Sequence, residues 1–237
     1  MKSIKIILLC VMTNLIYGQT NYKIGDTLNV LSFSGLILRN SPTVNGLKID
    51  KLEFGDKVVI HEIFKDIDTI ELRVGNWVSV SMEKKSGYVF DGFLSTLNKP
   101  QSAELEEGDL MGYMERINSK TANNYCSVEF EYPSDSDKKG GPATVTKLSE
   151  NIIYMFHIDY ECRTHQYIFS DRREAELFCL LDLFYSNMKC CNTNLLESIK
   201  AQNLENLKKF TLNRIGGMGF DFHSGLNRKS ISYYECN

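Results

Sequence analysis

The sequence predicts a small all-β barrel followed by an α+β domain, in which an antiparallel sheet packs with two helices. In residues 21–97, short apolar stretches with period-two alternation are separated by turn residues such as Gly25-Asp26 and Ser41-Pro42. In residues 113–237, similar strand patterns are joined by segments whose apolar residues recur at helical spacing. A third observation separates the two regions, because every cysteine beyond the first twenty residues lies in the second one.

Residues 1–18 are predicted to be a secretory signal peptide. Lys2 and Lys5 precede the apolar run 6–12, and Gly18 provides a small residue for cleavage. The apolar run is too short to span a bilayer. Cys10 follows Leu9, where lipid attachment would need a small residue. The sequence therefore predicts a secreted or periplasmic protein with no stable membrane anchor.

The composition is that of an ordinary globular protein, with 43% hydrophobic and 24% charged residues. Removal of residues 1–18 takes away Lys2 and Lys5, which leaves 25 basic residues against 30 acidic ones and a net charge of -5. These charges are spread along the chain. The balance argues against a nucleic acid as the partner.

Four segments of the first region carry a shared pattern of branched or aromatic residues next to a turn. After a first strand within residues 22–30, they read GLILRNSP at 35–42, LEFGDKVVI at 52–60, NWVSV at 76–80 and SGYVFDGFLS at 86–95. In this order and spacing they resemble the motifs of the bacterial SH3 (SH3b) domain. The residues that match the family are Arg39, Pro42, Gly55, Trp77, Gly87 and Leu94, whereas Ile37, Asn40 and Phe93 depart from it.

The resemblance to SH3b domains implies both a fold and a class of function. Residues 21–97 would form an SH3-like barrel of five or six short strands. The protein would be a non-enzymatic module that binds a cell-envelope peptide, glycan or protein ligand. Because SH3b domains often accompany cell-wall hydrolases, an envelope hydrolase with its active site in the C-terminal domain is the alternative.

Three aromatic residues are the candidate ligand-binding residues of the barrel: Trp77, Tyr88 and Phe93. They could form a partly exposed groove for an extended ligand. Trp77 could equally pack on the barrel as a core residue. A ring with one polar edge suits both roles, so the sequence leaves the two alternatives open.

Residues 98–112 are predicted to be an inter-domain linker. The segment opens with Pro100 and contains the acidic run Glu104 to Asp109. The C-terminal domain then covers residues 113–237.

The C-terminal domain begins with strand patterns. Strands are expected at 126–132, at 143–148 and, as a central strand, at 151–163, because bulky residues occupy both faces of the last segment. A fourth strand is expected at 165–169. After the glycines at 216, 217 and 219, period-two alternation returns with Phe220 and Phe222 and then with Ile231 and Tyr233.

Two helices are expected between these strands. Asp171 and Glu174 form a capping pair, and a helical stripe follows at Leu177, Leu180, Leu181, Phe184, Tyr185 and Met188. Cys179 lies nearly opposite that stripe, so its thiol should reach another segment. A second helix should start near Asn194, bury Leu196, Ile199, Leu207 and Phe210, and end at Lys208 and Lys209.

Six cysteines remain after signal cleavage: Cys126, Cys162, Cys179, Cys190, Cys191 and Cys236. An even number in an exported chain favours disulfides, which here allow 15 connectivities. The adjacent Cys190 and Cys191 would strain if joined. The preferred pairing is Cys126 with Cys162, with Cys179 and Cys236 bonded to Cys190 and Cys191 in either order.

Catalytic and metal motifs are weak in this sequence. Tyr125-Cys126-Ser127 is similar to the nucleophile segment of NlpC/P60 peptidases, but a strand pattern follows where that family has a helix. His157 with Asp159 and Asp221 with His223 could bind one Zn²⁺ if their strands were neighbours; a solvated sheet face is the simpler interpretation. No motif predicts a cofactor or a resident metal.

Overall fold

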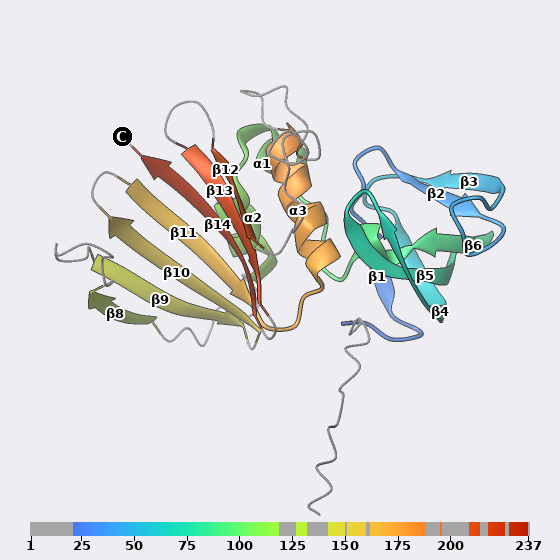
Figure 1. Cartoon of the computed structure of the whole chain (residues 1–237), viewed down its shortest axis with the longest axis horizontal. Coiled ribbons are helices and arrows are strands. Elements are labelled where there is room, and N and C mark those ends of the chain that lie inside the picture. Colours follow the sequence, from blue (N-terminus) through green and yellow to red (C-terminus); the bar gives the residue numbers. More distant parts are fainter. Residues whose placement is uncertain are drawn as a thin grey trace, which may run out of the picture.

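The computed structural model describes residues 21–118, 127–131, 142–149, 151–159, 162–187, 195, 209–213, 218–225 and 228–236. In this part of the chain, two seven-stranded antiparallel sheets lie on either side of one helix, α3 (Glu174–Asn187) (Figure 1). Two shorter helices lie beside α3. The predicted order of an all-β region followed by an α+β region is confirmed at this level.

The first sheet is curled and has the strand order β3-β2-β6-β5-β4-β1-β7. Register shifts in the β4–β5 pair between Ile60 and Glu62 and between Ile63 and Ile67 help the long strands to bend. Side chains on the inside of the curl, such as Leu28, Leu52 and Val78, are fully buried. The elements are β1 (Thr27–Val30), β2 (Leu36–Arg39), β3 (Lys48–Leu52), β4 (Lys57–Ile70), β5 (Arg73–Met82), β6 (Lys85–Phe90), the short 3₁₀ helix η1 (Asp91–Phe93) and β7 (Leu94–Ser95).

Motif residues of this sheet have clear structural roles. Gly55 has a φ of 84°, which favours glycine, and its N–H donates to the Val30 carbonyl at 2.8 Å. A Cβ on Gly87 would lie 2.6 Å from the Arg39 carbonyl oxygen, so the close approach of β2 and β6 needs a glycine there. The Arg39 Nη1 donates to the Gly46 carbonyl at 2.7 Å and closes the β2–β3 loop.

The segment predicted as a linker, residues 98–112, forms α1 (Ser102–Glu107) and the first three residues of α2 (Leu110–Asn118). The Gln101 N–H donates to the Glu104 carboxylate at 2.6 Å, so one of the acidic residues caps α1. Glu104 also pairs with Arg116 of α2 at 2.6 Å. Four apolar residues bury the inner side of the two helices: Leu105, Leu110, Tyr113 and Met114.

The second sheet has the strand order β12-β13-β14-β11-β10-β9-β8 and packs one face against α3. Aromatic side chains such as Tyr167, Phe169, Phe220 and Phe222 fill that face. Its strands are β8 (Ser127–Glu131), β9 (Pro142–Ser149), β10 (Ile152–Asp159), β11 (Cys162–Phe169), β12 (Lys209–Asn213), β13 (Met218–Ser224) and β14 (Lys229–Cys236).

Two predicted boundaries in this region are wrong. The central strand expected over residues 151–163 ends at Asp159, and the chain returns as β11 with Asp159 opposite Cys162. Period-two alternation continues through the hairpin, which hides the turn. Phe210, expected to be buried by a second helix, belongs to β12, where it pairs with Phe222. Apart from Leu195, that predicted helix lies outside the described residues before position 209.

The described cysteines differ from the predicted pairing. Cys162 bonds Cys236 and not Cys126, because β11 and β14 are neighbours whose register places these two residues opposite each other, with Cα atoms 4.0 Å apart. Cys179 is a free, buried thiol. Cys126, Cys190 and Cys191 lie outside the described residues. Their predicted pairs are wrong, because each needed Cys162, Cys236 or Cys179 as the other member.

A membrane-spanning helix would need a long apolar run, and none of the helices in the described ranges is long and apolar enough.

Candidate functional site

Helix α3 is shared by both sheets, and its two sides differ. One side carries apolar residues such as Leu177, Leu180 and Phe184, which pack in the core. The other side faces the first sheet and carries polar residues three or four positions apart, starting just before the helix: Arg173, Glu176, Cys179, Asp182 and Ser186. The contacts of this polar side define the candidate site.

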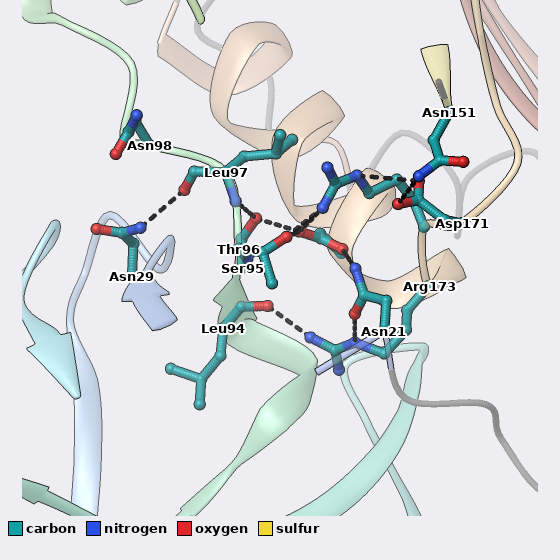
Figure 2. Close-up of polar contacts among 12 residues, drawn as sticks. Asn21, Asn29, Leu94, Ser95, Thr96, Leu97, Asn98, Asn151, Asp171 and Arg173 are labelled. Atoms are coloured by element: carbon teal, nitrogen blue, oxygen red, sulfur yellow. Dashed lines mark hydrogen bonds and ion pairs between the residues drawn. The ribbon is translucent and has the colours of Figure 1, made fainter. Parts of the chain in front are cut away.

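Arg173 joins the start of α3 to the end of the first sheet (Figure 2). Its guanidinium donates to the Leu94 carbonyl at 2.7 Å and to the Asn21 side chain at 3.1 Å. It also donates to the Asp91 carbonyl at 3.1 Å. It also pairs with the Asp91 carboxylate at 3.0 Å, where both side chains are largely buried. The Asp91 carboxylate is further bonded by the Tyr22 hydroxyl and by the Asn76 N–H at 2.7 Å.

Glu176 is the second buried carboxylate at this end of the helix. It is 0% exposed and accepts hydrogen bonds from the Asn21 amide at 2.8 Å, the Thr96 N–H at 3.0 Å and the Ser95 hydroxyl. Figure 2 shows Asn21, Ser95 and Thr96 gathered around this point. We call Asp91, Arg173 and Glu176 the interdomain clamp. Its charges are enclosed by partners, which is the requirement for burying them.

Arg73 of β5 makes the main polar contact between the first sheet and the C-terminal part of α3. Its side chain is 3% exposed, and its Nη2 donates to the Asp182 carboxylate of α3 at 2.8 Å. The guanidinium lies between two rings, 4.6 Å from the Phe93 centroid and 4.9 Å from the Phe178 centroid. Burial opposes its charge, but the Cys179 sulfur and the Asp182 carboxylate raise the pKa of Arg73 above its ordinary value.

The hairpin turn before Arg73 has an uncommon backbone. Glu71 and Leu72 have φ values of 49° and 66°, a region that residues other than glycine rarely adopt. Leu72 packs against the core, and the Glu71 carbonyl accepts from the Arg73 Nη1 at 3.1 Å. Two positive φ values are typical of a two-residue hairpin turn, and Arg73 follows directly after it as the first residue of β5.

Cys179 is fully buried between α3 and η1. Its sulfur accepts from the Arg73 Nε at 3.3 Å, and its S–H donates to the Gly92 carbonyl at 3.3 Å. Burial raises the pKa of the Cys179 thiol despite the nearby guanidinium. The group is therefore a neutral thiol at pH 7 with both hydrogen-bonding roles in use, which makes it a poor nucleophile.

Arg73 lines a cavity of about 380 Å³ between the first sheet and α3, which we call the interdomain pocket. Its first wall is the loop 31–34, where the Ser32 and Ser34 hydroxyls lie 3.3 Å apart and Phe33 is 60% exposed. The opposite wall consists of Asp182, Leu183 and Ser186 of α3.

The pocket carries more negative than positive charge. Arg73 is engaged by Asp182, while the Glu71 carboxylate is 57% exposed and the Asp182 carboxylate is 31% exposed. Two carboxylates against one committed guanidinium favour ligands that present ammonium or hydroxyl groups. The exposed Phe33 ring at the rim offers a surface for an apolar or cationic group.

The predicted ligand-binding aromatics are only partly brought together. Trp77 is 5% exposed, lies 6.1 Å from the Phe90 ring and donates its N–H to the Asp68 carboxylate at 3.1 Å. Phe93 is 9% exposed, also contacts Phe90 and lines the interdomain pocket. Tyr88 instead packs against Phe64, with ring centroids 5.6 Å apart. The burial of Trp77 agrees with the packing alternative.

The hypothetical zinc site is not formed. His157 and Asp159 lie on β10, and Asp221 and His223 lie on β13, with β14 and β11 between these strands. Three strand spacings separate the pairs by roughly 14 Å. In the described ranges, no group of three or more His, Cys, Asp or Glu residues is close enough to hold a metal ion.

Sequence reasoning missed the interdomain pocket for an identifiable reason. The polar spacing along α3 was readable, but Arg73 reaches it from a strand more than one hundred residues earlier, through a turn without glycine. Comparisons with protein-family models, with curated proteins and with solved structures find no match for this chain.

Proposed function

We propose that this protein is a secreted or periplasmic, non-enzymatic binding module with an SH3b-like, SH3-barrel first domain. Its ligand would be a cell-envelope peptide, glycan or protein, bound in the interdomain pocket. The observation that carries the proposal is this pocket, which has an exposed aromatic ring at its rim and an acidic wall. Pockets between domains are common places for ligands.

The export part of the proposal has two supports. The first residues have the pattern of a cleavable signal peptide. The Cys162–Cys236 disulfide is compatible with an oxidising compartment, where such bonds form and persist.

The ligand class follows from the groups in the pocket. Envelope peptides carry amino groups, which the Glu71 and Asp182 carboxylates would attract, and glycans carry hydroxyls, which the Ser32 and Ser34 side chains can bond. The mature net charge of -5 gives the same preference and disfavours nucleic acid.

The alternative, an envelope hydrolase, would need an activated nucleophile. Cys179 does not supply one, because its pKa is raised and its hydrogen bonds are in use. Cys126, the residue that is similar to a peptidase nucleophile, lies outside the described residues. The binding module is therefore the better supported of the two.

The test is retention of the purified mature protein on insoluble cell-wall material. Phe33→Ala and Glu71→Gln should each weaken retention roughly tenfold, since a rim contact of this kind contributes about 1–2 kcal/mol. Ile24→Ala is a matched control, because Ile24 is 61% exposed but does not line the pocket. Glu83→Gln is the second control, because Glu83 also has a positive φ, of 54°.

The expected result is that both controls bind as the natural protein does. If the natural protein is not retained, or if the control variants lose as much binding as the pocket variants, the proposed site is wrong.

A further inference from the structure

A second cavity lies on the face of the second sheet that is turned away from α3. It has a volume of about 400 Å³ and is formed where β13, β14 and β11 lie side by side. His223, Ser230 and Ile168 stand opposite one another across these three strands. The alternation of strand side chains separates this face from the aromatic face of Tyr167 and Phe169, so the cavity is distinct from the interdomain pocket.

The rim of this cavity is basic. Arg228, Lys229 and His223 line it, and no carboxylate belongs to the lining. In the described ranges, none of these three side chains forms an ion pair. The other described arginines are all engaged with carboxylate or carbonyl partners: Arg39, Arg73, Arg116, Arg163, Arg172 and Arg173.

The floor of the cavity is apolar with one polar pair. Ile168 supplies an apolar surface, and apolar atoms contribute most of the lining. The Gln166 amide donates to the Ser230 hydroxyl at 3.3 Å, so the Ser230 O–H remains able to donate to a ligand. Ser230 itself is 7% exposed, which reduces competition from water at that hydroxyl.

The nearest acidic residue on this face limits the charge that a ligand would meet. Asp221 lies two residues before His223 on β13 and faces Ser232, one row away from the cavity. The Lys229 side chain belongs to the opposite face, because its register partners are Phe169 and Ser224. Arg228 is therefore the permanent cation on the cavity side, and the lining contains no carboxylate.

We propose that this cavity, the basic cavity, binds a small amphipathic organic anion. The anionic group would be held by Arg228 with a hydrogen bond from Ser230, and the apolar part would rest on Ile168. The site is independent of the interdomain pocket and has the opposite charge preference. The protein would then hold two different ligands on two sides of its second domain.

The test uses the fluorescent probe anilinonaphthalene sulfonate with the purified mature protein. The natural protein should bind it at one site, and octanoate should displace it while the uncharged octanol should not. Arg228→Gln should weaken binding roughly tenfold, the usual size of one lost hydrogen bond to a charged group. Lys229→Gln should change binding little, because that side chain lies on the opposite face of the sheet. Raising the salt concentration should weaken binding as well.

Two matched controls separate this site from the rest of the molecule. Arg163→Gln changes an exposed arginine on β11 outside the cavity, and Glu71→Gln changes the interdomain pocket. Both should bind the probe as the natural protein does, and all variants should keep the far-UV circular dichroism spectrum. The proposal is overturned if the natural protein does not bind the probe, if octanol competes as well as octanoate, or if Arg228→Gln binds normally.

Discussion

The polar side of α3 carries arginine–carboxylate contacts at both ends, but the carboxylates are buried at the start of the helix and partly exposed toward its end. At the start of the helix, the side chains of Asp91 and Glu176 are 1% and 0% exposed and are surrounded by hydrogen-bond donors. Toward its end, Arg73 is as deeply buried, but its partners Asp182 and Glu71 are 31% and 57% exposed.

The difference indicates what each end can do. A buried charge with a full set of partners has no capacity left for a ligand, and removing one partner leaves a charge that water cannot reach. A half-exposed carboxylate keeps free lone pairs and remains available to a ligand. The interdomain clamp therefore fixes the two domains, while the interdomain pocket uses the fixed walls for binding.

The largest effect is expected at the interdomain clamp. Arg173→Met removes the guanidinium from the buried Asp91 carboxylate and should lower the free energy of unfolding by about 3–5 kcal/mol. Urea denaturation measures the change. The matched control is Arg163→Met, because the pair of Arg163 with Glu235 is 61% and 42% exposed and should contribute less than about 1 kcal/mol. Equal losses in the two variants would contradict the clamp.

The disulfide provides a comparison inside the second domain. Replacing both Cys162 and Cys236 by Ser should lower the free energy of unfolding by about 2–4 kcal/mol, because the bridge closes a chain segment with a sequence separation of 74. The bond joins β11 to β14 away from the first sheet. Retention on cell-wall material should therefore be unchanged in the folded variant, and a loss of retention would show that the two regions are coupled.

Alkaline pH should open the interdomain clamp. Burial, followed by the Asp91 carboxylate, raises the pKa of Tyr22 above its ordinary value of 10.0. The unfolded chain loses this proton near pH 10 while the folded protein keeps it. The contribution of Tyr22 to the free energy of unfolding is therefore complete below pH 10, and above pH 10 it falls by about 1.4 kcal/mol per pH unit.

Urea titrations between neutral and alkaline pH test this dependence. Tyr22→Phe should be less stable at neutral pH, because it lacks the hydrogen bond to Asp91, but its stability should fall less steeply above pH 10. An unchanged slope would mean that Tyr22 is not part of the clamp's pH response.

A smaller effect is expected at the pocket end. Asp182→Asn removes one carboxylate partner from Arg73 but leaves the Glu71 carboxylate and carbonyl and the Cys179 sulfur in place, so the free energy of unfolding should fall by about 1 kcal/mol. The same variant should weaken retention on cell-wall material. A loss of stability as large as that of Arg173→Met would show that the two ends do not differ.

Local patterns in the sequence predicted local structure well. The leucine stripe predicted α3, although the helix begins at Glu174 and the Asp171 carboxylate accepts from the Asn151 amide at 2.9 Å. The motif glycines Gly55 and Gly87 lie at turns or close strand contacts that need them. The strand pattern in the first region predicted a small barrel of five or six strands, and the structure has a curled antiparallel sheet of seven strands there. These features depend on neighbours in sequence or on a single pair of strands.

Features that depend on distant partners were not readable. Cys179 was correctly placed opposite the apolar stripe, but its partner is a guanidinium from β5 and not another cysteine. The acidic segment after Pro100 has the composition of a solvated linker. In the structure, Glu104 instead caps α1 and pairs with Arg116 of α2, a partner that the local pattern does not show. The Cys162–Cys236 bond requires the strand order of the second sheet, which alternation does not encode.

Thiol labelling along one side of α3 tests the central claim most directly. Cys179 and Ser186 both line the interdomain pocket, but Cys179 is only 2% exposed, whereas Ser186 is half-buried. In the folded Ser186→Cys variant, peptide mapping after reaction with a thiol reagent should find position 186 labelled and Cys179 unlabelled. Soluble cell-wall fragments should slow the reaction at 186. Equal labelling of both positions in the folded protein, or no protection by the fragments, would contradict a contact that is closed at one end and open to ligand at the other.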